Sequence, residues 1–183
     1  LAGQTQSTFM DEDTFAEMID NYGPSGDTNI RQTQIRYTHQ FSSGMALDGA
    51  LENPEATIQS QAGNGVNGNL NAQSIDKMPD IIARFRYKAS WGAVNASGVA
   101  RYFTYSQGNF ANDSTFGGGV HGGVTVNTWG KDKLKGTFNY GPGIGRYIRT
   151  SAAGNTDTYV TCAGGSNATL TPGCGPDLQV TTM

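Results

Sequence analysis

The chain has 183 residues, enough for a single domain, and only 36% of them are hydrophobic. Its apolar runs fall short of the ~18 residues that indicate a transmembrane helix, and its 10% of aromatic residues argues against a disordered chain. The formal net charge of −3 gives no overall attraction to nucleic acid. The 26 glycines and the aromatic residues favour an all-β protein. Because the first residue is Leu1 and not an initiator Met, we expect a piece of a longer protein.

The first predicted strand spans residues 1–10, in which polar and apolar side chains alternate weakly. Gln4 and Gln6 share one face of this strand, and Phe9 lies on the other. Residues 11–30 are acidic and rich in turn-forming residues. They predict a long, structured loop after the first strand.

The next stretch, residues 31–55, alternates with the two-residue period of β-strands. The odd positions of its first half carry the large apolar side chains Ile35, Tyr37 and Phe41. Even positions are polar, among them Arg36. After a Ser-Ser-Gly turn the pattern resumes, with Asp48 and Glu52 on the polar face. This arrangement predicts a β-hairpin.

The length and polarity of these segments decide which kind of sheet they form. They continue for about 10 residues, whereas strands of soluble proteins average about 5 or 6. Tilted strands of about 9 to 11 residues cross a bilayer. A transmembrane barrel alternates in this way because one face meets lipid and the other meets a polar lumen. We therefore expect an antiparallel transmembrane β-barrel.

A glycine- and asparagine-rich loop, residues 59–80, precedes the clearest strand, residues 81–91. One face of that strand is apolar and carries Ile81, Ala83, Phe85, Tyr87, Ala89 and Trp91. The other face carries Arg84, Arg86, Lys88 and Ser90. The core of a soluble protein does not accept three cations on an inward face. This strand therefore also favours a polar lumen.

Three further strands are predicted beyond residue 91. A short connection at residues 92–98 leads into a strand of unclear phase; if Arg101 faces water, then Ala100, Tyr102 and Thr104 face lipid. After a loop at 107–118, residues 119–129 place Val120, Val124 and Val126 opposite His121, Thr125 and Asn127. After a tight turn, the last strand places Leu134, Gly136, Phe138 and Tyr140 outward and Lys133, Lys135, Thr137 and Asn139 inward. At most one broken strand follows.

The connections alternate between long and short along the chain. Residues 1–183 are thus interpreted as one partial barrel segment with long loops at about 11–30, 59–80, 107–118 and 142–183. Outer-membrane barrels have short periplasmic turns and long outer loops, and a β-sandwich does not require this regularity. Trp91 and Trp129 fall beside short turns, where an aromatic girdle is expected.

Six sequence segments resemble, in order and spacing, the DcaP-like family of outer-membrane porins. They are GQTQSTFMD (3–11), YGPSG (22–26), RQTQIRYT (31–38), LENPE (51–55), PDIIARFRY (79–87) and YGPGIGRY (140–147). The resemblance covers about the first 150 residues. It implies a trimer of sixteen-stranded barrels in the outer membrane of a Gram-negative bacterium, with about seven strands supplied by this chain. It also implies that small anionic solutes, dicarboxylates among them, pass a basic constriction.

The candidate pore-lining residues come from neighbouring strands and from the start of the hairpin. They are Arg31, Arg36, Arg84, Arg86, Lys88, Arg101, Asp48 and Glu52. Clustered cations concentrate anions, and arginine offers a two-pronged contact to a carboxylate. The two carboxylates either form a transverse field opposite the arginines or pair with them. A selectivity filter and a set of wall-stabilising ion pairs therefore both remain open.

No motif indicates an enzyme, a metal site or a cofactor. Cys162 and Cys174 lie in a loop-like segment without a nearby histidine, which favours one disulfide made in an oxidising compartment over two free thiols. The two histidines, His39 and His121, are expected on different faces, which disfavours a shared metal or a nucleophile–base pair. The glycine-rich run at 141–145 lacks the lysine and the helix of a phosphate loop.

Three functional classes follow from these observations. The first is a passive porin, embedded in outer-membrane lipid, for small anionic solutes. The second is a structural or adhesive outer-membrane barrel whose lumen is plugged, and the third is a secreted β-sandwich binding module. A detergent requirement separates the third class from the others, and conductance in a planar bilayer separates the first from the second.

Overall fold

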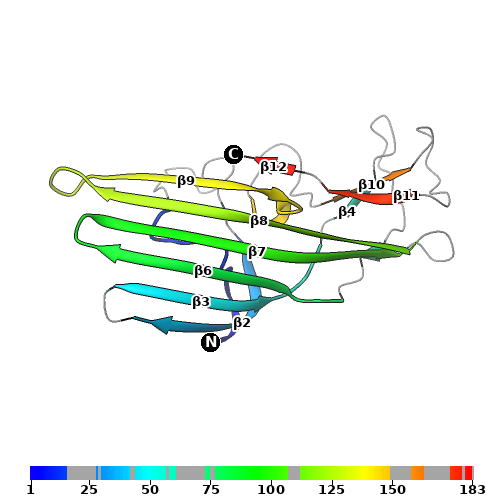
Figure 1. The fold of residues 1–183 in the computed structure, drawn as a ribbon, viewed down its shortest axis with the longest axis horizontal. Helices are drawn as coiled ribbons and strands as arrows, with labels where there is room; N and C mark the ends of the chain where they lie inside the picture. The colour runs from blue at the N-terminus through cyan, green and yellow to red at the C-terminus, as the bar shows by residue number, and fades with distance from the viewer. Residues whose placement is uncertain are drawn as a thin grey trace.

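The computed structural model describes residues 1–15, 28, 30–41, 44–56, 58–60, 73–74, 77–106, 112–148, 158–162, 174–178 and 180–182. One antiparallel sheet dominates the fold (Figure 1). Seven of its strands follow one another in chain order: β1 (Ala2–Gln6), β2 (Arg31–Gln40), β3 (Met45–Glu52), β6 (Asp80–Ala89), β7 (Gly92–Ser106), β8 (Asn112–Asn127) and β9 (Lys133–Pro142). These seven strands match the seven that the sequence predicts.

Five short strands complete the described structure. Three of them lie beyond residue 142, where the sequence predicts at most one broken strand. In the main sheet, β12 (Val180–Thr182) pairs with β9, and β5 (Gln73–Ser74) pairs with the end of β7. A separate small sheet contains β4 (Ile58–Ser60), β10 (Thr158–Cys162) and β11 (Cys174–Leu178), beside the end of the main sheet opposite the tight turns (Figure 1). Among the described strands the main sheet stays open, with β1 and β12 at its two edges. The described residues include no helix long and apolar enough to cross a bilayer.

The glycine-rich connections are shorter than the sequence predicts. Residues 92–98 were expected as a connection but belong to β7, and part of the expected loop at 107–118 belongs to β8. The reason is close packing: a Cβ at Gly92 would overlap the Thr125 carbonyl oxygen, and one at Gly119 would lie 2.8 Å from Ile144 Cγ2. Glycine is usually depleted in strands, but here it lets neighbouring backbone and side chains approach closely.

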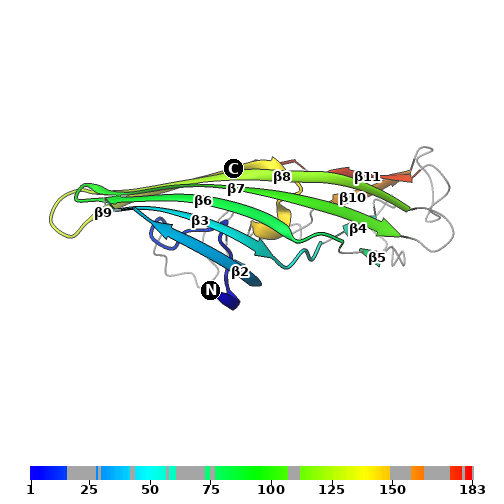
Figure 2. The same cartoon turned by 60° about the horizontal axis from the view of Figure 1, so that its bottom comes forward.

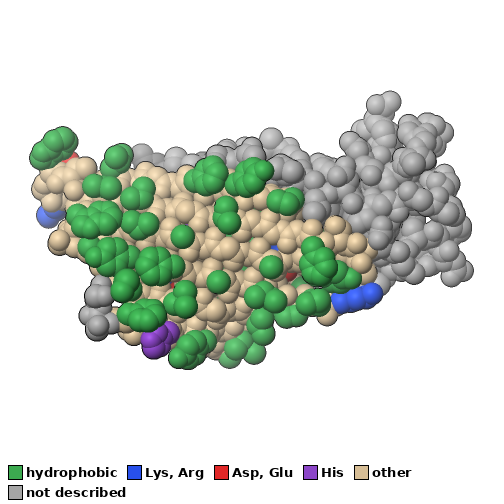
Figure 3. Space-filling view, viewed as in Figure 1, with side chains coloured by type: hydrophobic (Ala, Val, Ile, Leu, Met, Phe, Trp, Pro, Cys, Tyr) green, Lys and Arg blue, Asp and Glu red, His purple; other side chains and the backbone are tan. Residues whose placement is uncertain are grey.

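The two faces of the sheet differ in the way that the alternation predicts. Large apolar side chains are exposed on the outer face, including Ile35 (66% exposed), Phe85 (40%) and Phe138 (53%). Figure 3 shows hydrophobic side chains spread over this face. Val124 is exposed and Tyr87 partly exposed on the same face, as expected. The outer phase of β7 is correct at Ala100 and Tyr102, but Thr104 is buried, next to the pair of residues where β5 joins β7.

Two segments lie across the inner face of the sheet (Figure 2). The first, residues 7–15, follows β1 directly, and we call it the strap. The second, residues 143–148, follows β9 and contains the short 3₁₀ helix η1 (Gly145–Tyr147). They enclose a small apolar core that consists of Phe9, Ala50, Ile82, Val99, Ile144, Tyr147 and Ile148, with Ile30 packed against it. The sequence predicts that residues 7–10 continue the first strand, whereas β1 ends at Gln6. For residues 11–15 it predicts a structured loop but not the inward course of that loop.

Candidate functional site

The strap is anchored at its start to the polar face of β3 and β2. The Ser7 hydroxyl donates to Glu52 Oε2 at 2.7 Å, and the Thr8 backbone N–H donates to Glu52 Oε1 at 2.5 Å. The Thr8 hydroxyl also donates to Gln34 Oε1 at 2.7 Å. All four residues are buried. Glu52 therefore satisfies polar groups of the strap and does not face an open lumen.

Beyond residue 8 the strap crosses the strands from β6 to β9. Its backbone carbonyls accept hydrogen bonds from one side chain of each strand: Arg84 to Met10 (2.5 Å), Ser97 to Phe9 (2.6 Å), Thr125 to Asp13 (2.9 Å) and Lys135 to Phe15 (2.7 Å). Asn95 donates to both Asp11 Oδ2 and Thr14 Oγ1, each at 2.8 Å. A segment without regular structure is thus held by the inward polar residues of the strands.

Asp48 forms the centre of the ion-pair cluster on the wall. It lies directly opposite Arg84 in the β3–β6 register. Arg84 Nε and Arg86 Nε both lie 2.9 Å from Asp48 Oδ2, and the Thr38 hydroxyl donates to Oδ1 at 2.5 Å. The Asp48 side chain is fully buried, that of Arg84 is 7% exposed, and that of Arg86 is 27% exposed. One carboxylate is therefore shared by two arginines and compensates one of their two positive charges.

A second cluster surrounds Arg101 on β7. Arg101 Nε lies 2.9 Å from Asp80 Oδ2, and its Nη1 donates to the Gly143 carbonyl at 2.6 Å. The Tyr147 hydroxyl donates to the same carboxylate oxygen at 2.7 Å, and its ring lies 5.1 Å from the Arg101 guanidinium carbon. Burial and then the Asp80 charge raise the pKa of Tyr147 well above its ordinary value, so the hydroxyl remains a donor. This cluster fastens the 143–148 segment to the wall.

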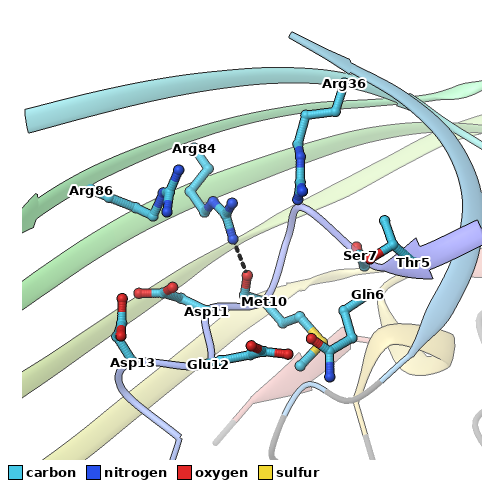
Figure 4. A pocket seen from close by; sticks show the side chains of 10 residues that line it. All are labelled: Thr5, Gln6, Ser7, Met10, Asp11, Glu12, Asp13, Arg36, Arg84 and Arg86. Atoms are coloured by element: carbon cyan, nitrogen blue, oxygen red, sulfur yellow. Dashed lines mark hydrogen bonds between the residues drawn. The ribbon is translucent and has the colours of Figure 1, made fainter. Parts of the chain in front are cut away.

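A cleft of about 310 Å³ opens between the strap and the wall beside the Asp48 cluster. Its lining consists of Thr5, Gln6, Ser7, Met10, Asp11, Glu12, Asp13, Arg36, Arg84 and Arg86. The three arginines extend from β2 and β6 toward the strap, and the three carboxylates project from the strap itself (Figure 4). Opposite charges thus lie on opposite sides of one water-accessible space.

The structure brings some of the predicted pore-lining residues together and separates others. Arg36, Arg84 and Arg86 line the cleft, with Asp48 behind them. Lys88 pairs with Asp13 at 2.5 Å near the strap, whereas Glu52 and Arg101 belong to the anchoring contacts described above. Arg31 is the exception: it is exposed and shares the outward parity of Ile35 on β2. Its prediction as a pore-lining residue is therefore wrong, because adjacent odd and even positions of a strand point to opposite faces.

The sequence analysis missed the acidic side of the cleft. It considered only Asp48 and Glu52, either as a field opposite the arginines or as their partners, and in the structure Asp48 is the partner of Arg84 and Arg86. The carboxylates on the acidic side are Asp11, Glu12 and Asp13, from the run that directly follows the first strand. The negative charge of this run was the sequence signal that could have identified it. We did not assign it to the site because an acidic loop usually projects into solvent. Asp80 was also missed as the partner of Arg101, because its position just after Pro79 suggested a loop end.

The other predicted features have mixed outcomes. In the backbone register Cys162 lies opposite Cys174. The structure describes only the backbone of these two residues, so the disulfide stays a prediction. His39 and His121 lie on opposite faces, as expected: His39 is exposed, and buried His121 contacts Asn139 Oδ1 through Nδ1 at 2.7 Å. Among the described residues no three His, Cys, Asp or Glu side chains gather as a metal site.

Comparison with known proteins shows a likeness of fold. No family model and no curated protein matches the chain. The structure is similar to the crystal structure of the outer membrane channel DcaP of Acinetobacter baumannii, with a TM-score of 0.65 and 22% sequence identity. The match covers 78% of this chain and 38% of that one. The chain therefore has the fold of part of an outer-membrane channel, as its sequence motifs imply.

Proposed function

We propose that this chain forms part of the wall of a water-filled channel in the bacterial outer membrane, through which small solutes diffuse passively. The observation that carries the proposal is the distribution of side chains on the sheet: large apolar residues are exposed on the outer face, while charged residues occupy the inner face. A bilayer stabilises such an outer face, since its hydrocarbon core accepts apolar side chains. The likeness to an outer membrane channel supports the same setting.

The proposal extends to a preference for anions and to assembly as a homotrimer of sixteen-stranded barrels. The trimer and the strand number rest on the sequence resemblance. The anion preference rests on the wall side of the cleft, where Arg36 forms no ion pair within the described part of the chain and Arg86 remains partly exposed. Arg84 and Arg101 contribute less to this field, because buried carboxylates already pair with them.

Reversal potentials in a salt gradient across a planar bilayer test this proposal. The channel should favour anions, and replacing Arg36 by glutamine should shift the reversal potential toward cations. The shift should weaken as salt rises, because the Debye length falls from about 10 Å at 0.1 M to about 3 Å at 1 M. Arg31→Gln is the matched control, since it removes the same charge from the outer face and should leave selectivity unchanged. Equal shifts from both variants would place the filter elsewhere.

The plugged barrel is a second candidate function that one observation favours. The strap is tied across β3, β6, β7, β8 and β9 by hydrogen bonds, and thus fills part of the inner face. A structural or adhesive barrel closed by this strap would insert into bilayers without conducting. A secreted β-sandwich fits less well, because its apolar faces pack against each other, whereas here that face is exposed in the described residues. Such a module would be monodisperse without detergent.

A further inference from the structure

Arg31 lies on the outer face of the sheet, at the end of β2 that is farthest from the tight turns. Its side chain is exposed and forms no ion pair in the described part of the chain. Glu55, the acidic residue that follows β3 at the same end, pairs with Arg146 instead. The charge of Arg31 is therefore available to an anion outside the protein, and the boundary of a membrane offers anionic headgroups.

Lys77 supplies a second available cation at the same end of the sheet. It lies four residues before Ile81 of β6, just as Arg31 lies four residues before Ile35 of β2. Ile35 and Ile81 both pair with Leu51, so these three apolar residues form one row across β2, β3 and β6. Lys77 is exposed and has no ion-pair partner among the described residues. Neighbouring strands are about 4.8 Å apart, so the axes of β2 and β6, with β3 between them, lie about 10 Å apart.

The apolar band of the outer face ends just below these cations. Outward apolar side chains follow β6 and its turn from Ile81 to Trp91, and both of these residues are exposed. At about 3.4 Å per residue and a tilt of about 45°, this stretch is about 24 Å tall, which matches the band of about 25 Å in outer-membrane barrels. Four further residues add about 10 Å of height, which reaches the headgroups. Figure 3 shows a basic group (blue) at the margin of the apolar surface, at the end opposite the tight turns.

We propose that Arg31 and Lys77 bind the phosphate groups of lipid A, the phosphorylated glycolipid of the outer leaflet. This inference rests on the proposed barrel in the outer membrane, but not on conduction through it. Short turns of such barrels face the periplasm, so the cations lie at the outer leaflet. Lipid A has phosphates at both ends of a disaccharide and acyl chains below them, which suits two separate cations above an apolar row. Arginine donates two parallel hydrogen bonds to a phosphate, and lysine acts as a point charge.

Native mass spectrometry of the detergent-solubilised channel, titrated with purified lipid A, tests the site. The probes are lipid A with both phosphates and the same lipid after both phosphates have been removed. Each cation near an anionic membrane surface contributes about fivefold in affinity, so the phosphorylated form should bind about 25-fold tighter. Equal affinities of the two forms would overturn the inference.

Paired substitutions assign this preference to the two cations. Arg31→Gln with Lys77→Gln should abolish the preference, whereas the charge-preserving pair Arg31→Lys with Lys77→Arg should keep most of it. The matched control is Lys131→Gln with Lys133→Gln, which removes two exposed cations at the turn end of the sheet and should leave the preference unchanged. A preference that persists without Arg31 and Lys77, or that is lost equally in the control, would contradict the site.

Other occupants of this surface are recognised in the same preparation. Phosphatidylglycerol that competes as strongly as lipid A would indicate a surface for any anionic lipid. Loss of the oligomer in the Arg31→Gln and Lys77→Gln variant, without any added lipid, would indicate a contact between copies of this chain. Either result would overturn the assignment to lipid A.

Conductance in planar bilayers separates this inference from the channel function. A protein that conducts but shows no preference for phosphorylated lipid A keeps the channel function and loses the lipid site. A protein that shows the preference but does not conduct keeps the lipid site and loses the channel function.

Discussion

The outer and inner faces of the main sheet follow opposite rules of burial. On the outer face Ile35, Phe85 and Phe138 are large, apolar and exposed; on the inner face Asp48, Arg84 and Arg101 are charged and buried. Among the described residues, no segment covers the apolar side chains of the outer face. Their stability therefore depends on the medium that surrounds the sheet. The inner face supplies its own partners, because every one of these charges is paired with another side chain. The comparison shows that this fold is stabilised by polar contacts on one face and, as we propose, by lipid on the other.

The largest expected effect comes from removing the acid that both wall arginines share. Asp48→Ala leaves Arg84 and Arg86 without their common carboxylate, and breaking a buried pair in this way costs about 3 to 5 kcal/mol. We expect this loss in the free energy of unfolding, measured by denaturant titration in lipid vesicles. The double variant in which Asp48 and Arg84 are both replaced by leucine should be less damaged than Asp48→Ala. A loss below about 1 kcal/mol would mean that the inner face does not depend on ion pairs.

The next effect tests the outer face. Phe85→Arg places a charge near the middle of β6 on the proposed lipid face, and a cation at the bilayer midplane costs about 2 to 4 kcal/mol. Leu134→Arg is the matched control, because Leu134 lies at the start of β9 beside the turn, where such a cost falls to about 0 to 1 kcal/mol. Unfolding in vesicles measures both. Equal and small costs would show that no hydrocarbon surrounds this face.

A smaller effect tests the contact between strap and sheet through two adjacent glycines. A Cβ at Gly123 would lie 2.8 Å from Thr14 Cβ, whereas a Cβ at Gly122 would meet nothing within 4 Å. Gly123→Ala should therefore displace the strap and cost about 1 to 3 kcal/mol through overpacking. Faster hydrogen exchange of the Asp11–Thr14 amides and a changed single-channel conductance would report this displacement. Gly122→Ala should alter neither quantity, and a change there would indicate a backbone effect of alanine.

The smallest effect concerns the exposed ion pair between Lys88 and Asp13. The side chains are 59% and 38% exposed, and water screens such a pair, so Lys88→Gln should cost about 0 to 1 kcal/mol. The same unfolding assay compares this cost with that of Asp48→Ala, and the difference measures how much burial strengthens an ion pair on this face. A cost of Lys88→Gln as large as that of Asp48→Ala would mean that burial does not determine the strength of charge pairs on this face.

Alternation along each strand was sufficient to predict which side chains share a face. Ile35 and Phe85 lie outward and Arg36 and Arg84 inward, as their parity requires, since successive residues of a strand point to opposite sides. The same rule applied to Arg31 would have placed it outward. Near Gly92 and Gly119 the alternation could not show which residues belong to a strand, because small residues there carry no pattern of polarity. The strand limits were mispredicted at these glycines. They were also mispredicted at residues 7–10, which leave the sheet after Gln6 although their side chains alternate.

The sequence by itself determined the all-β class, the polarity of the two faces and the residue types of the inner wall, because these properties depend on neighbours within one strand. Only the tertiary structure decided that Asp48 lies opposite Arg84, that Arg101 meets Asp80, and that the strap faces the wall arginines with Asp11, Glu12 and Asp13. Strand register and the path of an irregular segment depend on contacts between residues far apart in the chain, such as Thr125 with the Asp13 carbonyl. Such contacts leave no local period in the sequence, because the inward polar side chains that hold the strap alternate in the same way as those that face water.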